Sequence, residues 1–501
     1  MAHGCREATL ALVASAFRRK YTRAMSRAAS VIVTLALVQA PLFAQFDVAA
    51  PAPAGFDRAA AQRDTLEHLR RLIALDTQNP PGNEVIAAKY LESVLRSVPG
   101  VETHVLDPGD GRANVVARLR ATNPTKRAVL IMGHMDVVGV ERDKWMTPPF
   151  EATVRDGYLH GRGAIDDKGM LAASVAAIRQ LAGVRDRLDR DVILLGTAAE
   201  EGGDQGIERV ISDHFDLVKD AEFALNEGGR VRVRDGRIYT INVQTTEKLS
   251  YVVDVTATGT SGHGSVPLAD NAIAALGRAL ARVQEARAPV RLNAMTREYF
   301  EGLGKVEQEP RLRNAMLALA AARDQASIDT AAAVLSEDPR YNAVLRTGVS
   351  ITMIDGGIRA NVIPSGATAV LNVRVLPEGD IEADVAELNR IGGEPQVRFT
   401  LRGKPQTAPP VSSTATPLYQ ALKSAGEAMV RDVVVTPFMS TGATDGAALR
   451  ARGIPTYGIL PLPLTVDDEL RMHGDNERAP VQGLGWAAEY LYRVLLGVSG
   501  R

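Results

Sequence analysis

The sequence contains a single cysteine, Cys5, among its 501 residues. One cysteine excludes an internal disulfide framework, a cysteine-rich zinc site and an iron–sulfur cluster held by this chain alone. An excess of positive charge is also missing, because 58 Lys and Arg stand against 59 Asp and Glu. Without a basic excess we do not expect the chain to bind nucleic acid. Any metal chemistry must therefore use histidine, aspartate and glutamate.

A long apolar run is absent near the N-terminus as well. Residues 28–46 carry no charge and follow a basic stretch, but a threonine, a glutamine and a proline interrupt them. The run falls short of the roughly 20 apolar residues of a membrane span, so a membrane anchor is the weaker alternative. A basic stretch, a short apolar core and small residues at the end predict a secretory signal peptide over 1–44, with translation starting at either Met1 or Met25.

The rest of the chain is expected to form two domains. Residues 45–56, rich in Pro and Ala, read as an extended tether. Residues 57–247 and 404–501 alternate helical spacing with short apolar runs. This pattern predicts an α/β fold, with a mostly parallel sheet covered by helices. Residues 248–403 alternate as half-exposed strands do and predict a smaller α+β domain inserted into the first, with an extra helical insertion at about 291–346.

Polar residues come directly after the first buried strand of the α/β part. The run RAVLIMG leads into His134 and Asp136. For this pair alone, a histidine that only caps the strand is the alternative. The glycine-rich loop GRGAIDDKG then presents Asp166 and Asp167 before a helix. For this loop alone, carboxylates that cap the helix N-terminus are the alternative.

Carboxylates also follow the next two buried strands. The run DVILLGTAA ends in Glu200 and Glu201, and the run EFALN ends in Glu227 before two glycines. Neighbouring carboxylates repel each other and favour a cation, although a solvated loop explains such a pair equally well. His473 lies in a loop before the last predicted helix.

Together these positions have one explanation in common. Successive strands would deliver histidine and carboxylate side chains to a single edge of the sheet, where α/β folds bind their ligands. Two histidines with three carboxylates suit a dinuclear zinc site. In such a site a carboxylate bridges two ions that lie about 3.5–4 Å apart.

The motifs at these positions resemble those of a known family. They are GHMDVV, GRGAIDDKG, the Glu-Glu pair, NEGG, GTSGHGSVP and the late histidine, and the similarity runs from TQNPPGNE (77–84) to HGDNE (473–477). The sequence resembles the zinc metallopeptidases of clan MH, which include acetylornithine deacetylase, succinyl-diaminopimelate desuccinylase, aminoacylase and glutamate carboxypeptidase. The long insert and the leader resemble the carboxypeptidase S-like branch.

The resemblance implies two Zn²⁺ ions per subunit, with Co²⁺ or Mn²⁺ as substitutes. One ion would be held by His134, Asp166 and Glu227. The other would be held by Asp166, Glu201 and His473, so that Asp166 bridges the two.

The resemblance also implies catalytic roles. Glu200 would be the general base for the attacking water. Asp136 would orient His134 through its second ring nitrogen. His263 would stabilise the oxyanion from the inserted lid domain, in the family across a dimer interface.

Four further positions match substrate-binding positions of the family. Asn361 in ANVIP and Arg374 in NVRVLP match lid residues that bind the substrate carboxylate. Gly442 and Thr444 in GATDG match a substrate-binding loop.

The expected activity is hydrolysis of a peptide or N-acyl amide bond next to a free carboxylate, in a secreted or periplasmic enzyme. The expected partners are a small peptide or N-acyl amino acid and, through the lid domain, a second copy of the chain, with no membrane span after processing. A dipeptidase or aminopeptidase of the same family, a one-zinc amidase and a non-catalytic solute-binding homologue are the alternatives.

Overall fold

The computed structural model describes residues 46, 48–203 and 205–500. The predicted signal peptide and the alternative start at Met25 lie outside the described residues. The Pro/Ala segment contacts the α/β part, since the N–H of Ala49 donates to the carbonyl oxygen of Met429 at 2.8 Å. Within the described part of the chain, no helix combines the length and the apolar character needed to cross a membrane.

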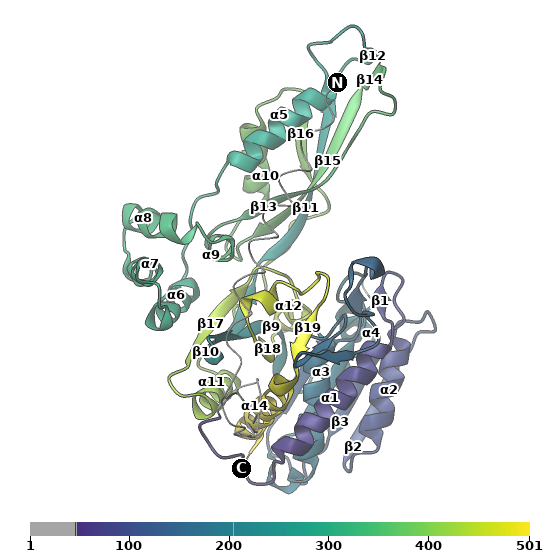
Figure 1. Cartoon of the computed structure of the whole chain (residues 1–501), viewed down its shortest axis with the longest axis vertical. Helices are drawn as coiled ribbons and strands as arrows, with labels where there is room; N and C mark the ends of the chain where they lie inside the picture. Colours follow the sequence, from purple (N-terminus) through teal and green to yellow (C-terminus); the bar gives the residue numbers. More distant parts are fainter. Residues whose placement is uncertain (1–45, 47, 204, 501) are drawn as a thin grey trace, which may run out of the picture. The chain divides into compact units, whose positions relative to one another are not determined.

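An eight-stranded sheet forms the centre of the α/β part (Figure 1). Four neighbouring pairs of its strands are parallel and three are antiparallel. The predicted α/β class is confirmed, and the sheet is mixed, with a parallel centre. In spatial order its strands are β17 (Val434–Ser440), β10 (Arg237–Glu247), β18 (Thr456–Leu464), β9 (Ala221–Arg234), β4 (Ala128–His134), β8 (Val192–Thr197), β3 (Asn114–Leu119) and β2 (Val101–Leu106).

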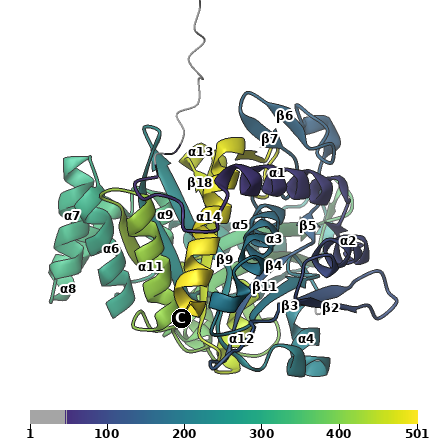
Figure 2. The same cartoon turned by 90° about the horizontal axis from the view of Figure 1, so that it is seen from below.

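Helices cover both faces of this sheet (Figures 1 and 2). Alternate residues of β4 belong to two different apolar clusters: Val129 and Ile131 to one, Leu130 and Met132 to the other. This alternation is the consequence of a strand that is buried on both sides. The larger cluster packs under α1 (Arg58–Ala74), α2 (Val85–Arg96), α3 (Lys168–Ala182), α11 (Pro417–Met429) and α14 (Val481–Ser499), and the smaller one under α4 (Ile207–Asp213) and α12 (Gly446–Ala451).

Strand β9 is longer than its apolar run predicts. The prediction that this strand ends at Glu227 is wrong, because β9 continues through two glycines to Arg234. Its residues 221–225 pair with β4, residues 224–232 with β18 and residues 230–234 with β10. Asp235 and Gly236, both at positive φ, form the tight turn that returns the chain into β10. Glu227 therefore lies inside a strand, two residues beyond the last pair with β4.

A separate four-stranded antiparallel sheet follows β10 in the chain. One face of the sheet packs on two helices through an apolar cluster of its own. These elements are β11 (Leu249–Thr258), β13 (Gly348–Gly356), β15 (Gly366–Val375), β16 (Val397–Leu401), α5 (Ala272–Glu285) and α10 (Ile381–Gly392). They agree with the strands and helices predicted between residues 248 and 403.

Four helices occupy the segment predicted as a helical insertion. They are α6 (Ala294–Val306), α7 (Pro310–Ala321), α8 (Gln325–Leu335) and α9 (Pro339–Leu345). Their apolar cluster includes Met439 of β17, and Thr436 Oγ1 donates to the carbonyl oxygen of Glu298 at 3.2 Å. The insertion therefore packs against the edge strand of the large sheet.

The remaining elements are short. They are β1 (Gln78–Asn79) with β5 (Val137–Val138), β12 (Gly262–His263) with β14 (Val362–Ile363), β6 (Thr153–Arg155) with β7 (Tyr158–His160) and β19 (Arg478–Pro480), helix α13 (Val466–Glu469), and the 3₁₀ helices Arg142–Lys144, Arg185–Arg187 and Phe215–Leu217.

Candidate metal centre

His134 ends β4, and both of its ring nitrogens face acceptors. Nε2 lies 2.9 Å from Oδ1 of Asp166. Nδ1 lies 3.0 Å from the backbone oxygen of Asp136 and 3.5 Å from that residue's Oδ1. With the proton on Nδ1, the arrangement presents Nε2 to the centre, as a ligand held by an outer hydrogen bond requires.

Asp166 lies between the two histidines named from the sequence. Its Oδ2 is 3.1 Å from Nε2 of His473, and the same nitrogen is 3.1 Å from Oε1 of Glu201. The structure therefore brings together segments that are more than 300 residues apart. Ligand atoms of His134, Asp166 and Glu201 lie within 4.8 Å of one another.

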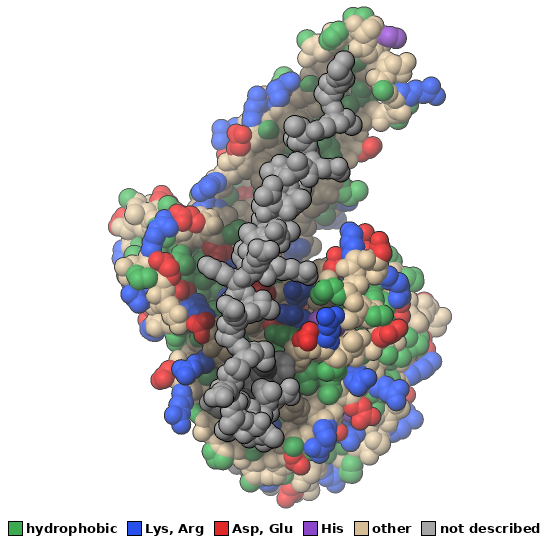
Figure 3. Space-filling view, in the orientation of Figure 1, with side chains coloured by type: hydrophobic (Ala, Val, Ile, Leu, Met, Phe, Trp, Pro, Cys, Tyr) green, Lys and Arg blue, Asp and Glu red, His purple; other side chains and the backbone are tan. Residues whose placement is uncertain are grey.

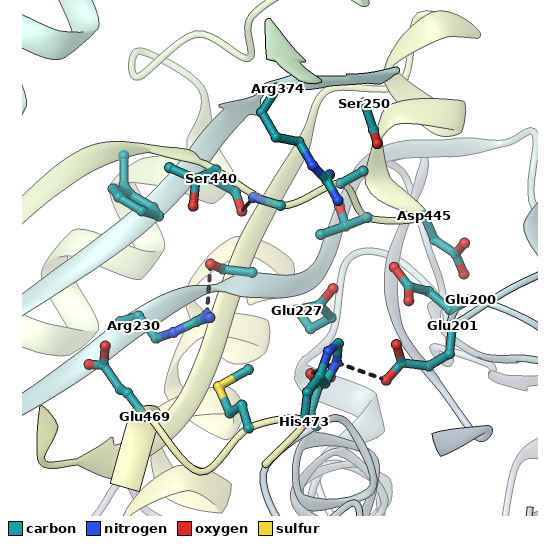
Figure 4. A pocket seen from close by; sticks show the side chains of 18 of the residues that line it. Glu200, Glu201, Glu227, Arg230, Ser250, Arg374, Ser440, Asp445, Glu469 and His473 are labelled. Carbon is teal, nitrogen blue, oxygen red and sulfur yellow. Dashed lines mark hydrogen bonds and ion pairs between the residues drawn. The ribbon is translucent and has the colours of Figure 1, made fainter. Parts of the chain in front are cut away.

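Glu200 and Glu227 line the same cavity as Asp166, Glu201 and His473 (Figure 4). Burial raises the pKa of Glu227 to about 8, and the nearby Asp166 carboxylate adds to this rise. Burial also raises the pKa of Glu200 well above its ordinary value. Each of these carboxylates thus needs either a proton or a cation close by.

The pKa of His473 is raised as well, but by hydrogen bonds and not by burial. Hydrogen bonds to Asp166 and Glu201 raise the pKa of His473 to about 10. For Asp166, burial alone would raise the pKa, but hydrogen bonds from His134 and His473 lower it below its ordinary value. Imidazole and carboxylate donors without thiols are the ligands expected for Zn²⁺ and similar divalent ions, so the residues present fit such a group.

The carboxylate of Asp136 has a second role that the sequence did not indicate. It is fully buried, and it accepts the backbone N–H of Glu200 at 3.1 Å and that of Glu201 at 3.0 Å. Nδ2 of Asn79 donates to it at 2.8 Å and also to the carbonyl oxygen of Gly202 at 2.7 Å. Asp136 and Asn79 thus hold the loop that carries the Glu-Glu pair.

Asp167 does not cap helix α3 with its side chain. It occupies the N-cap position, but its side chain makes no capping hydrogen bond. Both carboxylate oxygens are buried without a hydrogen-bond partner, and burial raises the pKa of the group. A Cβ atom at Gly133 would lie 2.2 Å from Oδ2 of Asp167, so Gly133 leaves the room that this carboxylate occupies.

Glu477 is another buried group that the sequence reasoning missed. Its Oε1 accepts the N–H groups of Ile165 and Asp166 at 2.7 and 3.1 Å, and its Oε2 accepts that of Gly163 at 3.0 Å. Arg162 donates to the same carboxylate at 2.7 Å. The signal was present in HGDNE, where this glutamate follows His473 by four residues.

The cavity beside the centre has a volume of about 740 Å³. Arg374, Gly442 and Thr444, three of the four predicted substrate-binding residues, line it. Hydrogen bonds also hold Thr444 in place, since its hydroxyl and its N–H donate to Glu247 at 2.8 and 3.0 Å. Three of the four residues therefore lie at the wall of this cavity, and their role in substrate binding stays a prediction.

His263 and Asn361 lie elsewhere. They belong to the short β12 and β14 region, where the N–H of Gly264 donates to the carbonyl oxygen of Asn361 at 2.8 Å. His263 is exposed, and its Nδ1 lies 2.7 Å from Oγ of Ser265. Neither residue lines the cavity of its own chain.

Known proteins are similar to this chain in sequence and in fold. The profile of Peptidase family M20/M25/M40 matches residues 130–497. The chain is 29% identical over 392 residues to probable carboxypeptidase S-like 2 of Dictyostelium discoideum, covering 76% of this chain and 74% of that protein. It is 28% identical over 416 residues to aminoacylase-1B of Rattus norvegicus, covering 82% and 89%.

Solved structures agree at the level of the fold. The M20 family metallo-carboxypeptidase Sso-CP2 of Sulfolobus solfataricus has a TM-score of 0.65 at 19% identity, covering 86% of this chain and 98% of that one. The profile match spans well over half of the chain. The chain therefore belongs to peptidase family M20/M25/M40, the metal-dependent hydrolases of amide bonds.

Proposed function

We propose that the protein is an exported dinuclear zinc hydrolase that cleaves a peptide or N-acyl amide bond next to a free carboxylate. The observation that carries this proposal is the cluster of His134, Asp166 and Glu201, whose ligand atoms lie within 4.8 Å of one another. Glu200 lines the same cavity as Asp166 and Glu201. The similarity to a carboxypeptidase-like protein and to an aminoacylase supports this choice of substrates.

Five residues would hold the two ions. His134 and Glu227 would bind one, Glu201 and His473 the other, and Asp166 would bridge them. When bound, the ions supply positive charge that makes water acidic enough to lose a proton near neutral pH and that polarises the amide carbonyl. We take Zn²⁺ as the native ion, with Co²⁺ or Mn²⁺ as substitutes.

Glu200 would move the proton. It lies next to the ligand Glu201, its backbone is fixed by Asp136, and burial raises its pKa. A carboxylate with a raised pKa accepts a proton from water and can return it to the leaving amine. Glu200 is therefore assigned as general base and then general acid.

Arg374 would bind the free carboxylate of the substrate. Its Nε donates to Oδ1 of Asn372 at 2.8 Å, which holds the side chain at the cavity wall. Among the described residues it has no carboxylate within ion-pair distance. A guanidinium group with free donors is suited to a carboxylate ligand.

A second copy of the chain would complete the site. The edge strand β13 is largely exposed and presents Ile351, Met353 and Ile354 to solvent, which favours pairing with another sheet edge. In such a homodimer the partner's His263 would donate to the oxyanion. Substituting H263A should then lower kcat without changing the sedimentation coefficient of the dimer.

Export rests on residues 1–44 alone. A fusion of this segment to a reporter that is active only outside the cytoplasm tests it.

On the surface, cationic and anionic side chains are interspersed over the face shown in Figure 3. This mixture, with a formal charge of -1, supports a small-molecule substrate in place of nucleic acid.

The proposal is tested by a substrate panel on zinc-loaded protein. We expect turnover of N-acyl amino acids or of peptides with a free C-terminal carboxylate. Turnover restricted to dipeptides with a free N-terminus would favour the dipeptidase or aminopeptidase alternative. Ligand binding without any turnover or bound metal would favour the solute-binding alternative.

A further inference from the structure

We infer that Arg230 anchors a second anionic group of the substrate, so that the preferred substrates carry one anion for Arg374 and another for Arg230. This inference rests on the proposed function, because it takes Arg374 as the first anchor. Four arginines line the cavity: Arg230, Arg232, Arg340 and Arg374.

Two of the four are already neutralised. Arg232 forms a two-point ion pair with Glu469, with distances of 2.9 and 3.2 Å. Arg340 pairs with Asp338 at 2.6 Å. These two guanidinium groups have carboxylates of the chain itself as partners and need no ligand.

Arg230 is different. It has no carboxylate within 4.0 Å among the described residues, and its Nη1 donates only to the carbonyl oxygens of Gly228 and Gly229, at 2.8 and 2.9 Å. These two bonds use one nitrogen and fix the position of the group. Among the described residues the other donors of the guanidinium have no hydrogen-bond acceptor, and Figure 4 shows the side chain directed into the cavity. A cation that is held in place before binding loses little entropy when an anion arrives.

The surroundings of Arg230 suit a chain that ends in an anion. Phe438 and Met472 line the same cavity and offer apolar surface for methylene groups. Arg374 belongs to β15 and Arg230 to β9, and Figure 4 shows the two side chains at separate places on the cavity wall. A substrate bridging them would have its anionic groups separated by several atoms, as in an N-acyl glutamate or an N-succinyl amino acid.

Another interpretation assigns Arg230 to the metal centre. The guanidinium lowers the pKa of Glu227 against the effects of burial and Asp166, so the arginine could serve only to keep that ligand charged. In that case loss of the charge would weaken metal binding and slow every substrate alike. The inferred subsite instead requires that loss of Arg230 affects anionic substrates selectively.

The experiment compares matched substrate pairs on wild-type protein and the R230Q variant. N-acetyl-glutamate against N-acetyl-glutamine tests an anion on the amine side of the scissile bond, and N-succinyl-leucine against N-butyryl-leucine tests one on the acyl side. R237Q is the control, because Arg237 is exposed at the start of β10. Zinc content is measured for each protein.

We expect the wild type to prefer the anionic member of one pair by about tenfold or more in kcat/KM, the effect of one charge-assisted hydrogen bond. R230Q should lose that preference and keep its zinc and its rate on the neutral member, whereas R237Q should behave as wild type. No preference in the wild type, or an equal loss on both members in R230Q, overturns the inference.

A binding measurement separates this inference from the proposed function. Calorimetric titration of zinc-loaded wild type with glutarate and with butyrate should show tighter binding of the dicarboxylate, and R230Q should remove the difference. Equal affinity for the two acids in the wild type overturns the subsite even if amides are hydrolysed. Selective glutarate binding without hydrolysis of any amide keeps the subsite and contradicts the proposed function.

Discussion

Nη1 of Arg162 lies 2.7 Å from Oε2 of Glu477, and both side chains are buried. The pair joins two loops that carry metal ligands. Glu477 accepts the backbone N–H of Asp166, and Arg162 donates to the carbonyl oxygen of Gly474, next to His473, at 2.9 Å. Through this pair the position of one ligand is tied to that of the other.

We predict that E477Q weakens the binding of metal and the stability of the fold together. The amide would place an N–H donor where the carboxylate accepts four hydrogen bonds, and Arg162 would lose its buried partner. Breaking a buried ion pair costs about 3–5 kcal/mol. Chelator competition should show weaker zinc binding, and denaturant unfolding should show lower stability. E151Q, at an exposed position, is the control. Unchanged zinc affinity in E477Q would contradict the linking role.

Asp136 gives a second prediction. Its carboxylate accepts the N–H groups of Glu200 and Glu201, and asparagine retains only one acceptor oxygen. D136N should lower zinc affinity or activity by about 10- to 100-fold, the usual effect of removing an outer hydrogen-bond partner of a metal site. Asp136 positions the general base Glu200, so the loss should appear in kcat more than in KM. A variant with normal kcat and normal zinc affinity would show that the loop holds its position without this carboxylate. D432N, in an exposed turn, is the matched control.

Lys248 gives a prediction on pH. In the sequence it lies between β10 of the large sheet and β11 of the antiparallel sheet. Its side chain is buried, and Nζ donates to the carbonyl oxygen of Arg346 at 2.5 Å. Burial, and then the charge of Arg374, lowers its pKa from 10.5 to about 8. Between pH 8 and 10.5 the unfolded state therefore binds more protons than the native state, and this group makes stability rise with pH.

The variant K248M removes that contribution. The stability of the wild type relative to K248M should increase by about 3 kcal/mol at most from pH 8 to 10.5, and should stay constant below pH 8. Denaturant unfolding of zinc-loaded protein across this range measures the difference. K219M, at an exposed lysine, should show no such change. A difference that is flat from pH 8 to 10.5 would mean that Lys248 titrates normally in the folded protein.

The sequence indicated the histidines and carboxylates of the candidate metal centre, but not the residues that hold them in place through hydrogen bonds. The apolar runs before His134 and Glu200 are fully buried strands, so their length and composition place the polar residues that follow at one sheet edge. The end of β9 was misjudged because its pairing with β18 and β10 continues past the glycines, and that pairing depends on residues far along the chain. A local apolar run carries no information about such partners.

The hydrogen bonds that hold the ligand loops could not be predicted from the sequence for a similar reason. Asp136 binds N–H groups 64 and 65 residues later in the chain, and Glu477 binds N–H groups more than 300 residues earlier. Any backbone can donate such bonds, so no side-chain motif marks the partner. The sequence did not single out Arg230, because only the structure shows which neighbouring arginines already have a carboxylate partner.

The most direct test of the account is the turnover of E200Q with its metal content measured on the same sample. Glutamine cannot accept the proton, while the five ligands are unchanged. We predict two bound zinc ions per chain, as in the wild type, with kcat lowered by about 10²- to 10⁴-fold, the usual contribution of a general base. Activity within a few-fold of the wild type, with both ions bound, would contradict the assignment of Glu200 and the mechanism built on it.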